Sequence, residues 1–494
     1  MAEEKKETNP EEKKNVKPEV PEEKTSVTEH SIVVNGRTLE YTVTAGTMLL
    51  KAEDEKEGEK PKATVFYIAY TLKNQDDASK RPLTFSFNGG PGSSSVWMHL
   101  GMLGPKRVLL EEDGMAVAPP YELVENEYTL LDKTDLVFID PVSTGYSRSV
   151  PGEEAKQFHS DKTDIESVGD FIHLYATRNT RWRSPMFLIG ESYGTTRAAG
   201  LSSYLSEKHG LYLNGIMLIS AILNFQTARF NEGNDLPFIL FLPTYTATAH
   251  YHHKLPAKQQ ERPLEELLEE VKQFASTDYT LALMQGAALS AQERTKIVNK
   301  LHNYTGLTKD YIERTDLRIN IHRFCKELRR DEFLTVGRID SRYTGYDRDA
   351  AGEHPERDPS MGATGGAYSA TLKDYVRREL GFEIDIPYNI LANLYRDWKY
   401  DRWENQYVNM AEELRKTMVT NPFMKIFVAN GFYDLATPYF ATEYTFNHLG
   451  IPAELQENIS MGYYESGHMM YVHMPSLVKI KDDLANFVDL ATKK

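Results

Sequence analysis

The segment "MFLIGESYGTTRAAGL" places one serine between two glycines, in the order Gly190-Glu191-Ser192-Tyr193-Gly194. An apolar run precedes the serine and small residues follow it, which is typical of a strand that turns sharply into a helix. Glycines on both sides remove the Cβ atoms that would crowd such a turn, so the serine projects its hydroxyl. We therefore predict that Ser192 is a nucleophile.

A serine hydroxyl attacks a carbonyl only when a base removes its proton. Asp434 in "VANGFYDLATP" and His468 in "MGYYESGHMMY" each follow an apolar run, and the order Ser, Asp, His is used by hydrolases with a serine at such a turn. We predict a triad in which His468 is the base and Asp434 orients it. Each residue has a simpler alternative, because Asp434 precedes Pro438 in a turn-like segment and His468 is one of 14 histidines.

The segment "FNGGPGSSSV" is rich in glycine and other small residues, which leave its backbone uncovered. It contains Asn88, Gly89, Gly90 and Pro91. Attack on a carbonyl creates an oxyanion, which two backbone N–H groups usually stabilise. The residue after the nucleophile, Tyr193, would supply one, and a glycine-rich loop after an earlier strand would supply the other. An ordinary tight turn is the alternative, but the position directly after the strand-like "LTFSF" favours the oxyanion loop.

The elements that must position these residues follow a recognisable order. Alternating β-branched and aromatic residues in "SIVVNGRTLEYTVTAG" and "ATVFYIAYTLK" predict antiparallel strands. Apolar runs then alternate with helical patterns, which indicates a mostly parallel central sheet with helices on both faces. This alternation stops for a helical lid insertion that includes an irregular stretch from Gly337 to Gly366, and it resumes at "MKIFVANG". The predicted divisions are a disordered charged tail (1–28), the first part of the core (29–225), the lid (226–415) and the second part of the core (416–494).

Composition narrows the possible functions. The chain has 57 basic and 72 acidic residues, a net charge of −15, and no basic stripe, so we expect no nucleic acid or membrane partner. The single cysteine, Cys325, excludes an intramolecular disulfide and a multi-cysteine metal site, and its helix-like surroundings indicate a packed side chain. We expect no metal and no cofactor, because a serine triad requires neither. The histidines in "HYHHK" point in different directions and have no partner carboxylate at helical spacing, so they do not predict a metal site.

Together, "NGGPGSS", "GESYG", the Asp434 loop and "SGHM" resemble the serine carboxypeptidase family, also called peptidase family S10. The segment "NEYTLLDKTDLVFIDPVSTGYSRS" is also similar, so the resemblance spans most of 84–475 apart from the insertion. It implies an α/β-hydrolase fold and removal of C-terminal residues from peptides with a free C-terminus, through an acyl-enzyme on Ser192. It also implies that the N–H groups of Gly90 and Tyr193 form the oxyanion hole.

The same resemblance implies that Asn88, Gly89 and Glu191 bind the terminal carboxylate of the substrate, which requires a proton shared between two carboxyl groups. Trp97 and Met469 resemble residues that line the substrate pocket, although plain core packing would explain both. The chain departs from the family pattern at two positions. Ser93 replaces a cysteine that forms a disulfide, and Met102 replaces a glutamate that helps to share the proton.

Two other functions fit the same residues. An esterase or acyltransferase would use the same triad with a different pocket, and an inactive binding protein would keep the fold without the chemistry. The Lys-, Glu- and Pro-rich start has no apolar signal region. We expect an exported protein, periplasmic or extracellular, whose signal is absent from this sequence, with a cytoplasmic location as the alternative.

Overall fold

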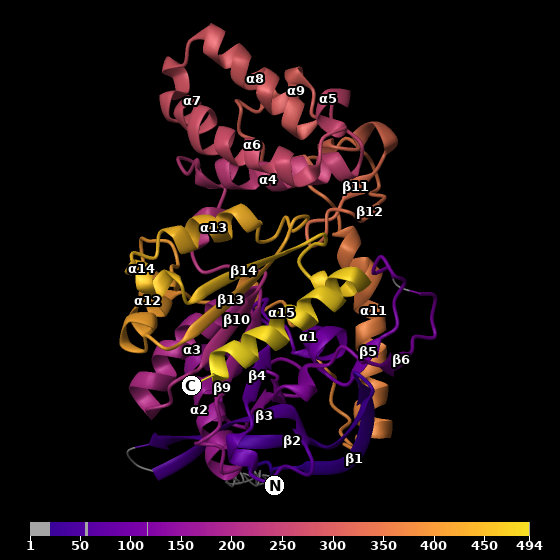
Figure 1. The fold of residues 1–494 in the computed structure, drawn as a ribbon, viewed down its shortest axis with the longest axis vertical. Coiled ribbons are helices and arrows are strands. Elements are labelled where there is room, and N and C mark those ends of the chain that lie inside the picture. The colour runs from indigo at the N-terminus through magenta and orange to yellow at the C-terminus, as the bar shows by residue number, and fades with distance from the viewer. Residues whose placement is uncertain (1–19, 55–57, 116, 494) are drawn as a thin grey trace, which may run out of the picture.

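The computed structural model describes residues 20–54, 58–115 and 117–493, and a mixed sheet forms its centre (Figure 1). Within these residues the sheet has ten strands in the order β1-β2-β3-β7-β4-β9-β10-β13-β14, with β8 paired to β3. Neighbours from β7 to β14 are parallel, and β1, β2, β3 and β8 pair antiparallel. The bounds are β1 (Thr25–Val34), β2 (Arg37–Asp54), β3 (Gly58–Leu72), β4 (Leu83–Phe87), β7 (Asp135–Ile139), β8 (Arg148–Ser149), β9 (Met186–Glu191), β10 (Gly215–Ile219), β13 (Lys425–Gly431) and β14 (Ile459–Tyr464).

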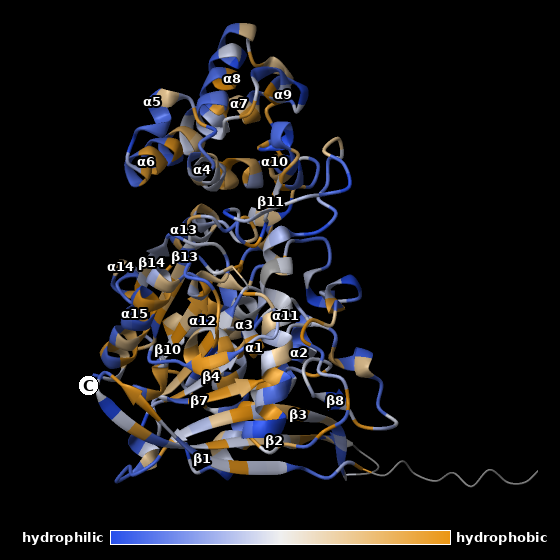
Figure 2. Cartoon of the chain, turned by 90° about the vertical axis from the view of Figure 1, so that its right-hand side faces the viewer, coloured by the Kyte–Doolittle hydropathy of each residue, from blue (hydrophilic) through white to orange (hydrophobic). Residues whose placement is uncertain are grey.

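Helices cover both faces of the parallel strands, as the continuous apolar runs predict. Along β9, Leu188 faces one side with the inner faces of α2 (Asp161–Arg178), α3 (Tyr193–His209) and α12 (Ala411–Thr420). Its neighbours Phe187 and Ile189 face the other side, where they pack with α11 (Pro359–Asp374) and α15 (Met474–Thr492). These two layers of buried side chains bracket strands that Figure 2 shows to be strongly hydrophobic.

The remaining elements lie around this core. They are α1 (Val96–Met98), which continues into a π-helical turn (His99–Leu103), β5 (Lys106–Val108), β6 (Leu123–Glu125), α13 (Tyr439–Asn447), α14 (Ala453–Gln456) and α15 (Met474–Thr492). None of the helices in the described residues is long and apolar enough to cross a bilayer.

Helices inserted between β10 and β13 build a lid with a hydrophobic core of its own, seen above the sheet in Figures 1 and 2. The predicted helix in "PLEELLEEVKQFA" is α6, which buries Leu267, Leu268, Val271 and Phe274 at helical spacing. The lid helices are α4 (Leu236–Tyr251), α5 (Ala257–Gln260), α6 (Leu264–Phe274), α7 (Thr280–Gln285), α8 (Ala291–Thr305), α9 (Lys309–Arg314) and α10 (Ile321–Glu327).

After α10 the chain returns to the core through β11 (Thr335–Val336) and β12 (Thr344–Gly345). The predicted irregular stretch ends earlier than Gly366, because α11 (Pro359–Asp374) begins inside it. Asp358 caps α11 by accepting the Ser360 N–H at 3.1 Å, and Pro359 stands at the first helical position. Both α11 and α12 pack on the sheet core, although α11 falls within the predicted lid boundaries and α12 crosses the predicted boundary at 415.

The N-terminal strand begins earlier than predicted. Residues 1–19 of the predicted tail lie outside the described residues, but β1 already starts at Thr25, so the prediction of disorder is wrong for residues 25–28. Thr25 pairs with Gly46 of β2, and the Lys24 carbonyl accepts the Thr47 N–H at 2.8 Å. Backbone pairing with β2 keeps residues 25–28 in a strand although most of their side chains are polar.

Candidate active site

Ser192 stands between the end of β9 and the start of α3, as the glycine pattern predicts. Its φ of +59° is strained for a residue with a side chain and costs about 1–3 kcal/mol. Its N–H donates to the Ile219 carbonyl at 3.0 Å, which fixes the turn against β10. A Cβ on Gly190 would lie 2.2 Å from the Gly194 carbonyl oxygen, and a Cβ on Gly194 would lie 2.7 Å from the Phe87 carbonyl oxygen, so both glycines are sterically required. The Ser192 side chain remains partly exposed.

Asp434 and His468 lie beyond the ends of β13 and β14, and their side chains meet. His468 Nδ1 is 2.7 Å from Asp434 Oδ2, and both residues are almost fully buried. The loop after Asp434 holds its carboxylate, because the N–H groups of Ala436 and Thr437 donate to Oδ1 at 2.8 and 2.9 Å. The Thr437 hydroxyl donates to Oδ2 at 2.7 Å. The carboxylate is therefore held in one orientation toward the imidazole.

The histidine loop is tied to the strand that supports the serine. Ser220 directly follows Ile219, the residue that accepts the Ser192 N–H, and its hydroxyl donates to the His468 carbonyl at 2.7 Å. Among the described residues no hydrogen bond joins Ser192 Oγ to His468. Such bonds are often long in free enzymes and tighten when substrate binds.

The segment that returns from the lid also holds both loops. The Arg338 carbonyl accepts the Leu435 N–H at 3.1 Å, and the Ile339 carbonyl accepts the His468 N–H at 2.7 Å. Asp340 Oδ2 accepts the Gly467 N–H at 2.9 Å and pairs with Arg342 at 2.6 Å, with both side chains of this pair buried.

The predicted oxyanion loop lies against the serine turn. A Cβ on Gly89 would lie 2.4 Å from the Tyr193 nitrogen, so the two backbones are in close contact. Gly90 has a φ of +105°, which a residue with a side chain rarely adopts. Neither the Gly90 nor the Tyr193 N–H donates to another group in the described chain. Two unpaired amide donors thus lie beside Ser192.

Glu191 is buried beside the triad, next to Asn88. The Tyr471 hydroxyl donates to Glu191 Oε2 at 2.6 Å. Burial raises the pKa of Glu191 to about 7, with Asp434 adding to the rise, while His468, Tyr471 and Asn88 oppose it. At neutral pH this carboxyl group is therefore close to half protonated.

Burial by itself would lower the pKa of His468. The charge and hydrogen bond of Asp434 outweigh that effect, Glu191 adds to it, and Arg338 opposes it, so the net pKa lies above the ordinary 6.5. His468 is therefore neutral, and ready to accept a proton, only when the pH exceeds this raised pKa.

Trp97 and Met469 are both buried in the sheet core, where packing alone accounts for them. The Trp97 ring lies 5.0 Å from the Tyr368 ring, centroid to centroid and tilted by 46°, and its Nε1 donates to Ser93 Oγ at 2.9 Å. Ser93, at the position of the family cysteine, thus anchors the turn with a hydrogen bond. The substrate contacts of Trp97 and Met469 remain predictions.

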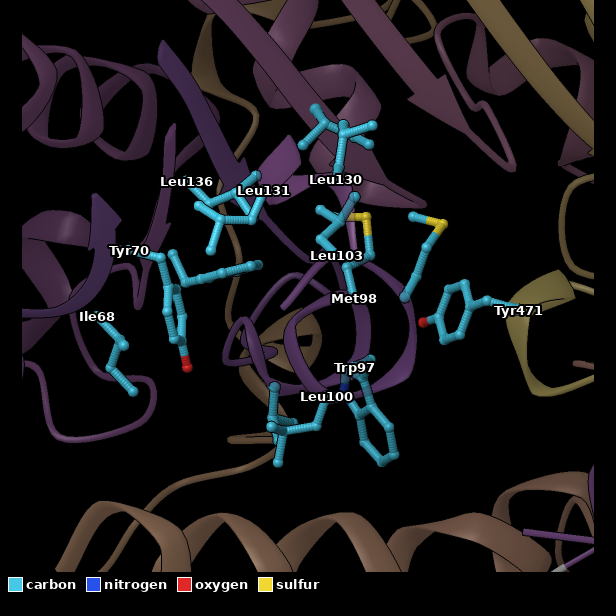
Figure 3. Packing of buried hydrophobic residues seen from close by; sticks show 14 of the residues in the cluster. Ile68, Tyr70, Trp97, Met98, Leu100, Leu103, Leu130, Leu131, Leu136 and Tyr471 are labelled. Atoms are coloured by element: carbon cyan, nitrogen blue, oxygen red, sulfur yellow. The ribbon is translucent and has the colours of Figure 1, made fainter. Parts of the chain in front are cut away.

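Met102 is buried in the π-helical turn of the same cluster. Tyr471 packs over this turn, because a Cβ on Gly101 would lie 2.5 Å from its ring (Figure 3). The hydroxyl that reaches Glu191 therefore comes from the segment after His468, on a residue that the sequence analysis missed. Its position three residues after the predicted base was the available signal.

Residues 55–473 match the serine carboxypeptidase family. The chain belongs to this family. A segment of the chain is 31% identical over 159 residues to the pheromone-processing carboxypeptidase of Saccharomyces cerevisiae, covering 30% of the chain and 20% of that protein. Serine carboxypeptidase-like protein 29 of Arabidopsis thaliana is 28% identical over 158 residues, covering 30% of the chain and 31% of that protein. The matched segments thus span less than a third of these two relatives.

The fold has a solved counterpart. The crystal structure of a prohormone-processing carboxypeptidase from Saccharomyces cerevisiae aligns with a TM-score of 0.51 at 17% identity, covering 91% of each chain. The family and the sheet topology establish an α/β-hydrolase fold, as the sequence predicts.

Proposed function

We propose that the protein is a serine-type carboxypeptidase that removes C-terminal residues from peptides through an acyl-enzyme on Ser192. The observation that carries this proposal is the buried carboxyl group of Glu191 beside the serine turn, with a pKa of about 7 and with Asn88 and Tyr471 next to it. A protonated Glu191 donates a hydrogen bond to a carboxylate, so it favours a substrate with a free C-terminus. Family membership supports the same reaction.

In the proposed reaction, His468 Nε2 takes the Ser192 proton while Oγ attacks the last peptide carbonyl. The N–H groups of Gly90 and Tyr193 stabilise the oxyanion, and Asp434 stabilises the imidazolium. When the intermediate collapses, the imidazolium gives its proton to the leaving amine and the C-terminal amino acid departs. Water, deprotonated by His468, then hydrolyses the acyl-enzyme. The products are one amino acid and a peptide shortened by one residue.

Three matched substrates test this function: an N-blocked dipeptide, its C-terminal amide and its ester with the same acyl part. We expect the free acid to be preferred strongly over the amide. Ser192→Ala should lower turnover by about 10⁶ and Asp434→Asn by about 10⁴. Equal hydrolysis of acid and amide would instead indicate an esterase or acyltransferase. Failure of a fluorophosphonate to label Ser192 would indicate an inactive binding protein.

A further inference from the structure

A cavity of about 300 Å³ lies between the lid and the loop that carries Asp434. Leu435 and Ala436 line its floor, immediately after the proposed triad acid. Arg229, which follows β10, and Arg338, on the lid-return segment, line it from two other directions. A larger cleft of about 520 Å³, lined by aromatic residues, continues on the other side of Arg229.

The charges in this cavity are unbalanced. Arg229 and Arg338 form no ion pair within the described residues, whereas two neighbouring lid arginines do. Arg318 pairs with Asp235 at 2.7 Å, and Arg323 pairs with Glu353 at 3.0 Å. No acidic side chain lines the cavity in the described chain. Asp358, which caps α11, accepts the backbone N–H of Arg338 at 3.2 Å and forms no ion pair with its guanidinium group.

This excess of positive charge is opposite in sign to the protein as a whole, whose net charge is −15. Two cations without ion-pair partners, one of them over the ring of Phe225 at 5.6 Å, concentrate positive potential in the cavity and attract an anionic group. Both arginines are solvent-exposed, so an incoming group reaches them without any movement of the lid. The cavity therefore has the charge and the access of an anion subsite.

The cavity belongs to the surroundings of the triad. Arg338 is adjacent to Ile339, whose carbonyl holds the His468 N–H at 2.7 Å. The charge of Arg338 also lowers the pKa of His468, which requires the two side chains to be near each other. The cavity thus adjoins the loop that carries Asp434 and the segment that holds the His468 backbone.

The orientation of the peptide in the proposed site follows from which of its residues are buried and which are open to solvent. Asn88, Glu191 and Tyr471 are buried, so the terminal carboxylate occupies the closed end. The rest of the peptide must then extend toward solvent. The arginine cavity lies between the lid and the Asp434 loop with both arginines exposed to solvent, and the aromatic cleft adjoins it at Arg229.

We propose that Arg229 and Arg338 bind an acidic side chain of the peptide upstream of the scissile bond, so that the protein prefers substrates with Asp or Glu near the C-terminus. This inference rests on the proposed carboxypeptidase function. Arginine holds carboxylates through charge-assisted, often bidentate hydrogen bonds, which makes the selection specific for an anion.

N-blocked peptides that differ only in the penultimate residue, or in the one before it, test the preference with Glu, Gln or Lys at that position. We expect kcat/KM for Glu to exceed that for Gln by about tenfold at one of these positions, and Lys to be the poorest. The Glu preference should shrink at 1 M salt, where exposed charges are screened within about 3 Å. In Arg229→Gln/Arg338→Gln the Glu-to-Gln ratio should fall to within about twofold.

Arg323→Gln is the matched control, because it removes an arginine of the lid that already has a partner, and the ratio should stay unchanged. A wild-type ratio near one at both positions would overturn the inference, and so would a Glu preference that survives the double substitution. If no peptide is cleaved although fluorophosphonate labels Ser192, the proposed peptidase function has failed instead. The Glu-to-Gln ratio compares two substrates of the same variant, so a general loss of activity lowers both kcat/KM values and leaves the ratio unchanged.

Discussion

At the scale of single residues, Glu191 and His468 impose opposite requirements on pH. His468 must be neutral to act as a base, and its pKa lies above 6.5. Glu191 must be protonated to donate to a substrate carboxylate, and its pKa is about 7. The two groups interact, so the limbs of a pH profile belong to the pair. Peptide hydrolysis is therefore expected to have a narrow optimum, with the descending limb set by loss of the Glu191 proton.

Glu191→Gln should remove that descending limb, because an amide donates to the carboxylate at every pH. The ascending limb should shift to lower pH, since the charge of Glu191 raises the pKa of His468. The measurement is kcat/KM for a blocked dipeptide between pH 5 and pH 9, in steps of about half a unit.

The ester of the same acyl part is the control, because it carries no terminal carboxylate and should rise to a plateau in both proteins. If wild-type peptide and ester profiles coincide, Glu191 does not bind the carboxylate.

The sequence predicted the candidate triad more readily than the groups that support it. Ser192, Asp434 and His468 were predicted because each follows an apolar strand, and the structure brings the last two within 2.7 Å. Ser220 was missed because a single hydroxyl after a strand carries no pattern, and Tyr471 was missed although it stands three residues after the predicted base. Their roles depend on contacts with residues hundreds of positions away, which only the folded chain reveals.

At the scale of elements, the oxyanion loop has no room for a side chain at Gly89. In Gly89→Ala the new Cβ would meet the Tyr193 nitrogen at 2.4 Å, so the loop must move away from the serine turn. Loss of one oxyanion donor typically costs 10² to 10³ in kcat, and we expect a fall of at least about 100-fold. Steady-state kinetics on the ester substrate measures it.

Gly362→Ala serves as the comparison, because a Cβ there meets nothing within 4 Å inside α11. This variant should keep full activity and gain about 0.5–1 kcal/mol in free energy of unfolding. Normal turnover in Gly89→Ala would show that the loop does not stabilise the oxyanion.

The lid-return segment positions the histidine through Asp340. Asp340→Ala leaves Arg342 buried without its partner, which should cost about 3–5 kcal/mol in free energy of unfolding. It also releases the Gly467 N–H beside His468, so kcat should fall while KM changes little. Asp340→Ala/Arg342→Met should recover stability without recovering kcat. Recovery of both would mean that the segment contributes only to stability.

Element boundaries show where sequence reasoning works. Strand β4 matches the predicted run "LTFSF" residue for residue, because a strand buried on both faces is uniformly apolar. Helix α11 was hidden by Gly362, Gly365 and Gly366, which lower its intrinsic helix propensity. Packing of Tyr368 and Leu372 on the sheet core stabilises it instead, and the Asp358-Pro359 start was the signal that had been overlooked.

At the scale of the whole molecule, no covalent cross-link holds the lid to the core within the chain, because Cys325 is its only cysteine. Its side chain is fully buried in the lid, and burial raises the pKa of its thiol, which keeps it protonated and unreactive. We expect the thermal unfolding midpoint to be the same with and without reductant.

A thiol reagent at pH 8 should label Cys325 only after denaturation. Rapid labelling of the native protein would contradict the burial of this helix, and a midpoint lowered by reductant would indicate a disulfide between two copies of the chain.

The lid-return segment also has a consequence for how the protein is made. Ser192 and its turn leave the ribosome long before the segment that holds Asp434 and His468 in register. A partly synthesised chain therefore carries a hydroxyl without a positioned base. Under the proposed function, competence to cleave a peptide therefore arises only once the lid has folded and strand β14 has joined the sheet.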